Sequence, residues 1–297
     1  MQKIRALVTG GTGFVGKYLV SLLKESEKFE IFLLESDIRE IEHLGEQIST
    51  ISPDYVFHLA AQAFVPKAIE DPWETEETNV KGTLNLLENL HRMGKPVKMV
   101  YVSTADVYGK QDFANLPFSE NLIPNPLNPY SGSKLAAESY CRQYAAYDKN
   151  LGIVIARPFN HIGVGQRNEF VIPNFCNQII LAEQSGYNFI HVGDLNPTRD
   201  FSNVKDIVRG YLLLAEVGIP GEIYNLCSGK EVSIRYLVET LIKFSGKNIE
   251  CKIDPSRIRS AETSRVYGDN SKMLKLGWKP EISIEQTLED IYHSIKQ

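Results

Sequence analysis

Several features that mark particular classes of protein are scarce in this chain of 297 residues. The four cysteines, Cys141, Cys176, Cys227 and Cys251, lie far apart without metal-like spacing, so we expect reduced, packed thiols and no metal site. Basic residues (32) do not exceed acidic ones (37), and a net charge of -5 argues against nucleic acid or an anionic membrane as partner. No apolar run approaches the roughly 20 residues of a membrane span, and no signal-like series follows Met1. We therefore expect a globular, cytoplasmic protein.

A glycine-rich turn separates the first apolar run from a helical pattern. Residues 4–9 predict a strand, Gly10, Gly13 and Gly16 follow, and apolar positions within residues 17–23 recur at helical spacing. These glycines would let the backbone turn tightly and approach a pyrophosphate, while the start of the helix offers free N–H groups. The segment favours a dinucleotide site over a purely structural turn.

Acidic residues follow the second predicted strand, residues 30–34. Glu35 stands about twenty residues past the glycine turn, where a carboxylate can accept a hydrogen bond from a ribose 2′-hydroxyl and repel a 2′-phosphate. It therefore favours NAD over NADP, although a strand-end glutamate is often merely solvated. Asp37 and Ile38 come shortly afterwards and could serve the adenine side instead.

Strand and helix patterns then alternate along the chain. We expect them at residues 41–50 (helix), 54–62 (strand), 72–92 (helix), 97–102 (strand) and 152–156 (strand). Such alternation predicts a parallel sheet with helices on both faces. Ala60 and Ala61 would allow a cofactor close to one strand end, or simply tight packing, and Thr104 at another strand end could contact a substrate oxygen or cap the next turn.

Tyr130 and Lys134 form the strongest candidate for chemistry. If Asn128 and Pro129 open a helix, the spacing of four places the phenol and the ammonium on one helical face. A nearby cation lowers the pKa of a tyrosine, which suits a residue that exchanges a proton near neutral pH. The same spacing also occurs by chance in helices where the tyrosine packs and the lysine is solvated.

The chain becomes more irregular beyond Arg157. We expect a dinucleotide-binding domain at residues 1–158, with 197–217 returning to it, and a ligand-binding lobe formed by 159–196 and 218–297. Arg199 and Arg259 suit bidentate phosphate binding, or surface ion pairs.

Taken together, the motifs resemble those of the extended short-chain dehydrogenase/reductase superfamily, in its nucleotide-sugar branch. The general motifs are Gly10-x-x-Gly13-x-x-Gly16, His58-Leu59-Ala60-Ala61, Asn79-x-x-Gly82-Thr83, Ser103-Thr104, Tyr130-x-x-x-Lys134 and Arg157-Pro158-x-Asn160. The second half looks most like the GDP-4-keto-6-deoxy-D-mannose reductases and GDP-mannose 4,6-dehydratases, through Phe159-Asn160-His161-Ile162-Gly163, Arg199-Asp200-Phe201 and Leu276-Gly277-Trp278-Lys279-Pro280. The resemblance implies a Rossmann-type doubly wound sheet with a smaller mixed α/β substrate lobe.

The resemblance also implies roles for individual residues. Tyr130 would be the acid/base, Lys134 would hold the nicotinamide ribose, and Thr104 would hydrogen-bond the reacting sugar oxygen. NADP or NAD would be bound by Gly10, Gly13, Phe14, Val15, Gly16, Glu35, Asp37, Ile38, Leu59, Ala60, Ala61, Asn79, Val102, Tyr130, Lys134 and Phe159. The nucleotide sugar would be bound by Thr104, Asn160, Val171, Arg199, Arg259 and Glu262.

Departures from the family motifs help to choose among the reactions that the family catalyses. Asp106 stands where the dehydratases usually carry a glutamate, one methylene longer, and remains a further catalytic candidate. Ala105 and Phe170 stand near the positions at which the epimerising GDP-fucose synthases carry a cysteine and a histidine for proton shuttling. The acid/base pair of those enzymes is therefore absent from these positions. We therefore expect reduction of a nucleotide-linked 4-keto-6-deoxyhexose, with GDP as the expected nucleotide, by a homodimer or homotetramer. A 4,6-dehydratase or C4 epimerase is the alternative, and a non-catalytic NAD(P)-sensing protein a third.

Overall fold

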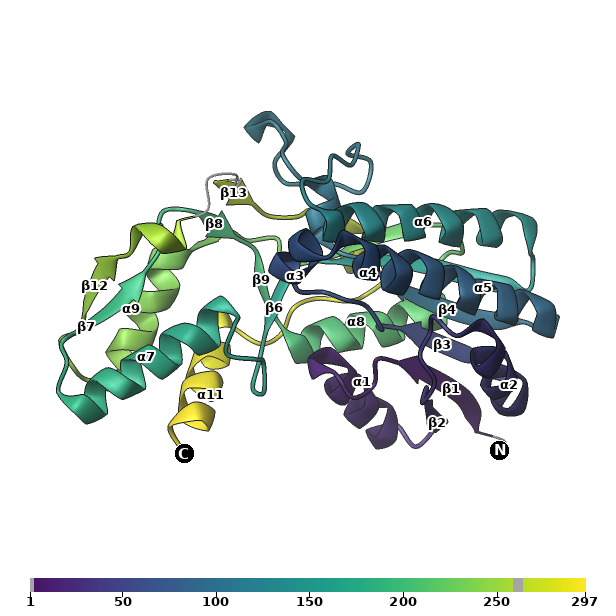
Figure 1. Ribbon diagram of the computed structural model, residues 1–297, viewed down its shortest axis with the longest axis horizontal. Helices are drawn as coiled ribbons and strands as arrows, with labels where there is room; N and C mark the ends of the chain where they lie inside the picture. Colours follow the sequence, from purple (N-terminus) through teal and green to yellow (C-terminus); the bar gives the residue numbers. More distant parts are fainter. Residues whose placement is uncertain (1–2, 259–263) are drawn as a thin grey trace.

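The computed structural model describes residues 3–258 and 264–297, built around a six-stranded parallel sheet (Figure 1). Across the sheet the strands are β10 (Ile223–Leu226), β5 (Leu151–Pro158), β4 (Val97–Val102), β3 (Tyr55–His58), β1 (Ile4–Thr9) and β2 (Phe29–Leu33). Because β2 and β3 lie on opposite sides of β1, the order of the strands reverses there, and open sheets of this kind bind ligands at the carboxyl ends of such strands, here β1 and β3. The predicted α/β fold with a doubly wound parallel sheet is confirmed.

Helices cover both faces of this sheet. On one face lie α1 (Phe14–Glu25) and α8 (Val204–Val217), and on the other α2 (Ile41–Ile51), α5 (Gly82–Met93) and α6 (Pro129–Tyr147) (Figure 1). Successive strand residues point to opposite faces, so that Val8 joins the core under α1 and α8, whereas Leu7 joins the core under α2, α5 and α6. The apolar strands are therefore buried on both sides, as their unbroken hydrophobic pattern predicts.

The helix predicted at residues 72–92 is present but is not uniform. It begins as α4 (Pro72–Glu76), widens into a π-helical turn at Glu77–Lys81, and continues as α5. A short helix, α3 (Val65–Glu70), precedes it and was not foreseen. The π turn contains Asn79, which is buried, and such turns often occur at functional sites.

A second lobe has its own hydrophobic core, seen at the left of Figure 1. Its helices are α7 (Val171–Ser185), α9 (Ile234–Ser245) and α11 (Ile284–Lys296). Short strands pair beside them: β7 (Phe189–Val192) with β12 (Glu250–Ile253), β8 (Thr198–Arg199) with β11 (Val232–Ser233) and β13 (Arg265–Val266), and β6 (Asn160–Ile162) with β9 (Phe201–Asn203). This mixture of helices and small sheets agrees with the expected mixed α/β lobe.

One strand does not follow the expected distribution between the lobes. β10 lies within residues 218–297, which we expected in the second lobe, yet it pairs with β5 at the edge of the main sheet. The short helix α10 (Ser271–Lys275) packs against it. Pairing with β10 occupies the edge hydrogen bonds of β5, which would otherwise be exposed. The remaining boundaries between the lobes stay a prediction.

Among the residues that the structure describes, no helix has both the length and the apolar character to cross a bilayer.

Candidate active site

The helix that carries Tyr130 and Lys134 begins at a well-defined cap. Asn128 precedes the first residue of α6, and its side-chain oxygen accepts a hydrogen bond from Ser131 N at 2.9 Å. The Ser131 hydroxyl in turn accepts from Asn128 N at 3.4 Å, which completes a capping box. The predicted helix start is confirmed, and Tyr130 is thereby held in the first turn of a rigid 19-residue helix.

Thr104 lies beside Tyr130 at the carboxyl end of β4. Its hydroxyl lies close enough to the Tyr130 side chain to favour the phenolate form, and its oxygen accepts from Asp106 N at 3.1 Å, where it caps a short 3-10 turn. Thr104 is therefore a cap, as one of the two interpretations of the sequence holds, and it also lies beside the phenol. Its contact with a substrate oxygen stays a prediction. Three residues from two distant segments converge at this point.

The electrostatics of Tyr130 differ from the prediction. Burial, and then the Asp106 carboxylate, raise the pKa of Tyr130, and the hydrogen bond from Thr104 opposes them only in part. We expected Lys134 to lower this pKa, which is wrong for the protein without cofactor. The Lys134 ammonium instead lies over the ring of Tyr101, 4.7 Å from its centroid. Tyr130 is consequently a protonated phenol at neutral pH.

Lys134 is almost completely buried, with 3% of its surface exposed. Burial lowers its pKa from 10.5 to about 8, and the neighbouring Cys141 and Glu138 act in the opposite direction. A lysine whose pKa lies so close to neutral pH can gain or lose its charge when its surroundings change. Those surroundings are therefore important for function.

The glycine turn between β1 and α1 forms a cradle at the start of the helix. Gly13 caps α1 without a side-chain hydrogen bond, so the first N–H groups of α1 are left without a side-chain cap from this residue. A Cβ on Gly16 would lie 2.2 Å from Gly10 O, and one on Gly10, whose φ is +68°, would lie 2.8 Å from Ala60 N. The turn therefore fits a diphosphate at the positive end of a 12-residue helix.

The loop after β3 lies against this cradle. Buried His58 bridges the Thr9 hydroxyl at 2.7 Å and the Thr83 hydroxyl at 3.0 Å, and Thr9 also accepts from Ala60 N at 3.1 Å. Burial, followed by the Lys134 charge, lowers the pKa of His58 to about 3, so its ring is neutral. Leu59, Ala60 and Ala61 are half-buried just past the carboxyl end of β3, as a close-approaching cofactor requires.

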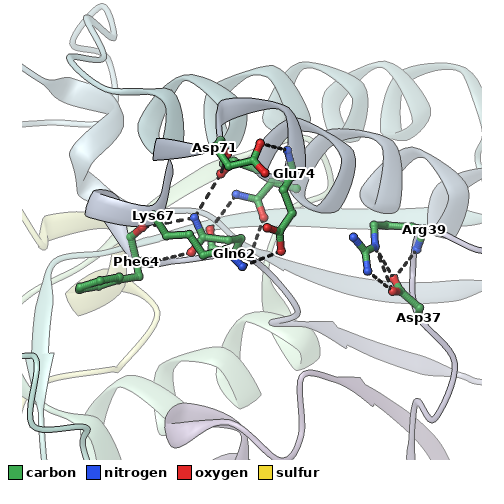
Figure 2. A network of polar contacts seen from close by, with 9 residues as sticks. Asp37, Arg39, Gln62, Phe64, Lys67, Asp71 and Glu74 are labelled. Carbon is green, nitrogen blue, oxygen red and sulfur yellow. Dashed lines mark hydrogen bonds and ion pairs between the residues drawn. The ribbon is translucent and has the colours of Figure 1, made fainter. Parts of the chain in front are cut away.

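Asn79, predicted to bind the cofactor, uses its amide within the protein. Its oxygen accepts from Gln62 N at 2.8 Å, and its nitrogen donates to Gln62 O at 3.0 Å and to Ser133 Oγ at 2.9 Å. Gln62 also hydrogen-bonds Phe64 N through its side-chain oxygen (Figure 2). Asn79 therefore ties the loop after β3 to the helix that bears Tyr130.

At the adenosine end, Asp37 is engaged by a residue that the sequence analysis overlooked. Arg39 donates to both carboxylate oxygens of Asp37, with Nε contacts of 3.0 and 2.9 Å and an Nη2 contact of 2.5 Å (Figure 2). The spacing of two in Asp-Ile-Arg could have suggested this pair. Glu35 is exposed just past β2, whereas Ile38 is buried against Gly82.

The remaining predicted residues lie near the carboxyl ends of the main-sheet strands or in the second lobe. Phe14 and Val15 form the first turn of α1, Val102 ends β4, and Phe159 is buried just past β5. Asn160 is exposed on β6, Val171 opens α7, and Arg199 lies on β8, where its Nη1 donates to Thr198 O at 2.8 Å. Arg259 and Glu262 fall outside the described residues. The ligand-binding roles of all these residues stay predictions.

Comparison with known proteins places this geometry in a family context. The family model for GDP-mannose 4,6 dehydratase matches residues 23–291. GDP-6-deoxy-D-mannose reductase of Pseudomonas aeruginosa is 43% identical over 97% of this chain and 95% of that protein. GDP-6-deoxy-D-talose 4-dehydrogenase of Aggregatibacter actinomycetemcomitans is 33% identical over 97% of each chain.

Solved structures agree with these similarities. RMD from Pseudomonas aeruginosa complexed with NADPH superposes with a TM-score of 0.91 at 40% identity, covering 98% of this chain and 99% of that one. UDP-glucose 4-epimerase from Thermotoga maritima with UDP-glucose gives a TM-score of 0.88 at 28% identity, covering 98% of each chain. The similarity extends over both lobes.

Proposed function

Because the chain belongs to the GDP-mannose 4,6-dehydratase family, we propose that it reduces the C4 ketone of a nucleotide-linked 4-keto-6-deoxyhexose. The proposed substrate is GDP-4-keto-6-deoxy-D-mannose, and the cofactor is a reduced nicotinamide dinucleotide. The observation that carries this proposal is Tyr130, a half-buried and protonated phenol that lies beside Thr104 at the end of a central strand. Reduction of a ketone requires such a proton donor.

Each residue of this cluster has a distinct part in the reaction. The reduced nicotinamide, when bound, supplies a hydride to the ketone carbon. Tyr130 transfers its proton to the C4 oxygen as negative charge develops there, and Thr104 orients that oxygen with its hydroxyl. Lys134 binds the nicotinamide ribose, and the Thr104 hydroxyl favours the phenolate that Tyr130 leaves behind. Burial of Thr104 and Lys134 limits the access of water to the cluster and strengthens these interactions.

For the cofactor, the cradle at Gly10 and Gly13 would hold the diphosphate. We propose NADH as the preferred form, because the exposed carboxylate of Glu35 would repel a 2′-phosphate. The neighbouring cation, Arg39, is already paired with Asp37, which leaves it less able to attract that phosphate. The structure of RMD from Pseudomonas aeruginosa is a complex with NADPH, so the two chains would differ at this end of the site.

The direct test follows the loss of reduced nicotinamide absorbance when purified protein meets GDP-4-keto-6-deoxymannose. Substrate-dependent oxidation of NADH, with the C4 hydroxyl sugar as product, is the expected result. No oxidation with either NADH or NADPH would refute the proposal. Tight cofactor binding without turnover on any sugar nucleotide would instead support an NAD(P)-sensing protein.

A 4,6-dehydratase is a second candidate because of Asp106. Its carboxylate acts electrostatically on Tyr130, so it lies near the proton that Tyr130 carries. Conversion of GDP-mannose to the 4-keto-6-deoxy sugar without added reductant, lost in Asp106→Asn, would favour the dehydratase. We expect no such conversion, since the shorter side chain misplaces the base and roughly 1 Å can cost about a hundredfold in rate.

The family context also supports a proposal for assembly and location. We propose a homodimer or homotetramer in the cytoplasm. Light scattering of the purified protein would distinguish these from a monomer.

A further inference from the structure

Three charged side chains are buried together beneath the candidate active site. Lys134 and Glu138 lie one turn apart on α6, and Arg157 reaches them from β5. Their exposed fractions are 3%, 2% and 2%. Glu138 accepts from Arg157 Nε at 2.9 Å and from Arg157 Nη2 at 2.6 Å, and Ser103 Oγ also donates to it. The cluster thus holds two cations and one anion away from water.

The other titratable groups around Lys134 are uncharged at neutral pH. They come from three elements: His58 on β3, Tyr101 on β4, and Tyr130 and Cys141 on α6. Burial lowers the pKa of His58 and raises those of Tyr101, Tyr130 and Cys141. Among these groups of the described chain, Glu138 is therefore the one that offers Lys134 a negative charge.

The Arg157 guanidinium and the Lys134 ammonium would respond differently to loss of the negative charge of Glu138. Two buried cations without an anion would be strongly unfavourable, and a guanidinium cannot lose its proton in a protein. The lysine can, and burial already favours its neutral form. Without Glu138, the cluster would therefore release the proton of Lys134.

We propose that Glu138 is a positioning residue, which keeps the Lys134 ammonium charged so that it can bind the cofactor. The inference rests on the proposed function only in the role given to Lys134. The arrangement explains why a glutamate is buried in the middle of α6, where a charged side chain is costly unless it is paired. Arg157 then opposes Glu138, because it shares the carboxylate and adds a second positive charge.

The test is a charge cycle with Glu138→Gln, Arg157→Gln and the double variant, in the protein without cofactor. The pKa of Lys134 is read by ¹³C NMR of lysines labelled at Cε, with Lys134→Arg assigning the resonance. From the wild-type value near 8, we expect Glu138→Gln to lower it by about one unit or more and Arg157→Gln to raise it. The double variant should lie between the two single variants.

The double variant also covers the case in which Glu138→Gln leaves Arg157 buried alone and fails to fold. Comparing Arg157→Gln with the double variant still isolates the Glu138 charge, since replacing both members of a buried pair is often tolerated. A fall of the Lys134 pKa between these two supports the proposal, and an unchanged or raised pKa overturns it. Glu183→Gln, which breaks the ion pair with Lys296 on the second lobe, should leave the pKa unchanged.

Cofactor affinity gives a second readout. Calorimetry would measure the pH above which NADH binding weakens. That pH should be lowest in Glu138→Gln, highest in Arg157→Gln and intermediate in the double variant, which is the order expected for the Lys134 pKa. A purely structural role of Glu138 would instead weaken binding equally at every pH. Because neither measurement uses a sugar substrate, failure of the proposed reduction would leave this result unaffected.

Discussion

Gly16→Ala should damage cofactor binding by moving the start of α1 away from the preceding turn. The added Cβ would lie 2.2 Å from Gly10 O and 2.7 Å from Gly11 Cα. Both are backbone atoms, so no side chain can rotate aside. Contacts of this kind need about 3 Å, so helix and turn must separate by roughly 1 Å, and overpacking of this kind costs about 1–3 kcal/mol of unfolding free energy.

The same displacement would disturb the N–H groups that we expect to hold the diphosphate. A hydrogen bond lengthened by close to 1 Å is effectively lost, and one to a charged group contributes about 1.5–3 kcal/mol. We therefore expect NADH or NADPH to bind about tenfold to a hundredfold more weakly, measured by calorimetry, together with a lower melting temperature.

Gly152→Ala provides the matched control. Its Cβ would meet no atom closer than Val97 O at 3.6 Å, an ordinary contact, so cofactor affinity should not change. If Gly16→Ala bound the cofactor as tightly as the wild type and melted at the same temperature, the cradle argument would be refuted.

Three further predictions concern single side chains. Tyr130→Phe should lower kcat by roughly 10²–10⁴-fold in the ketone reduction while leaving the dissociation constant of the cofactor nearly unchanged, and an unchanged rate would exclude Tyr130 as the acid. Glu35→Arg should shift the ratio of kcat/KM from NADH towards NADPH by about tenfold or more, and a wild-type enzyme that already prefers NADPH would contradict our assignment of Glu35. Folding lowers the pKa of His58 from 6.5 to about 3, so between these pH values the unfolded chain binds more protons than the folded one. The contribution of neutral His58 to the free energy of unfolding is therefore complete above about pH 6.5 and is lost as the pH falls. Urea unfolding should accordingly show a loss approaching 1.4 kcal/mol per pH unit in that window, which His58→Gln should reduce, and an equal slope in the variant would contradict the argument.

The sequence was informative wherever the signal is local. The limits of β1 and β4 and the start of α6 at its Asn128 cap could be predicted, because hydrophobic period and capping depend on neighbouring residues. The π turn at Glu77–Lys81 was missed, because no residue pattern within it differs from an ordinary helix. β10 was missed because its pairing with β5 joins residues far apart in the chain.

The candidate active site likewise has features that the sequence predicts and features that depend on the tertiary structure. The sequence alone determined that Tyr130 and Lys134 lie on one helix. It also determined that a glycine turn precedes the first helix, since both features depend on spacing along the chain. Only the tertiary structure decided their protonation. Burial and Asp106 keep Tyr130 protonated, and Lys134 points to the Tyr101 ring with Glu138 one turn away and Arg157 behind it. A pKa depends on which groups surround a side chain and on how much water reaches it, and packing of distant segments sets both.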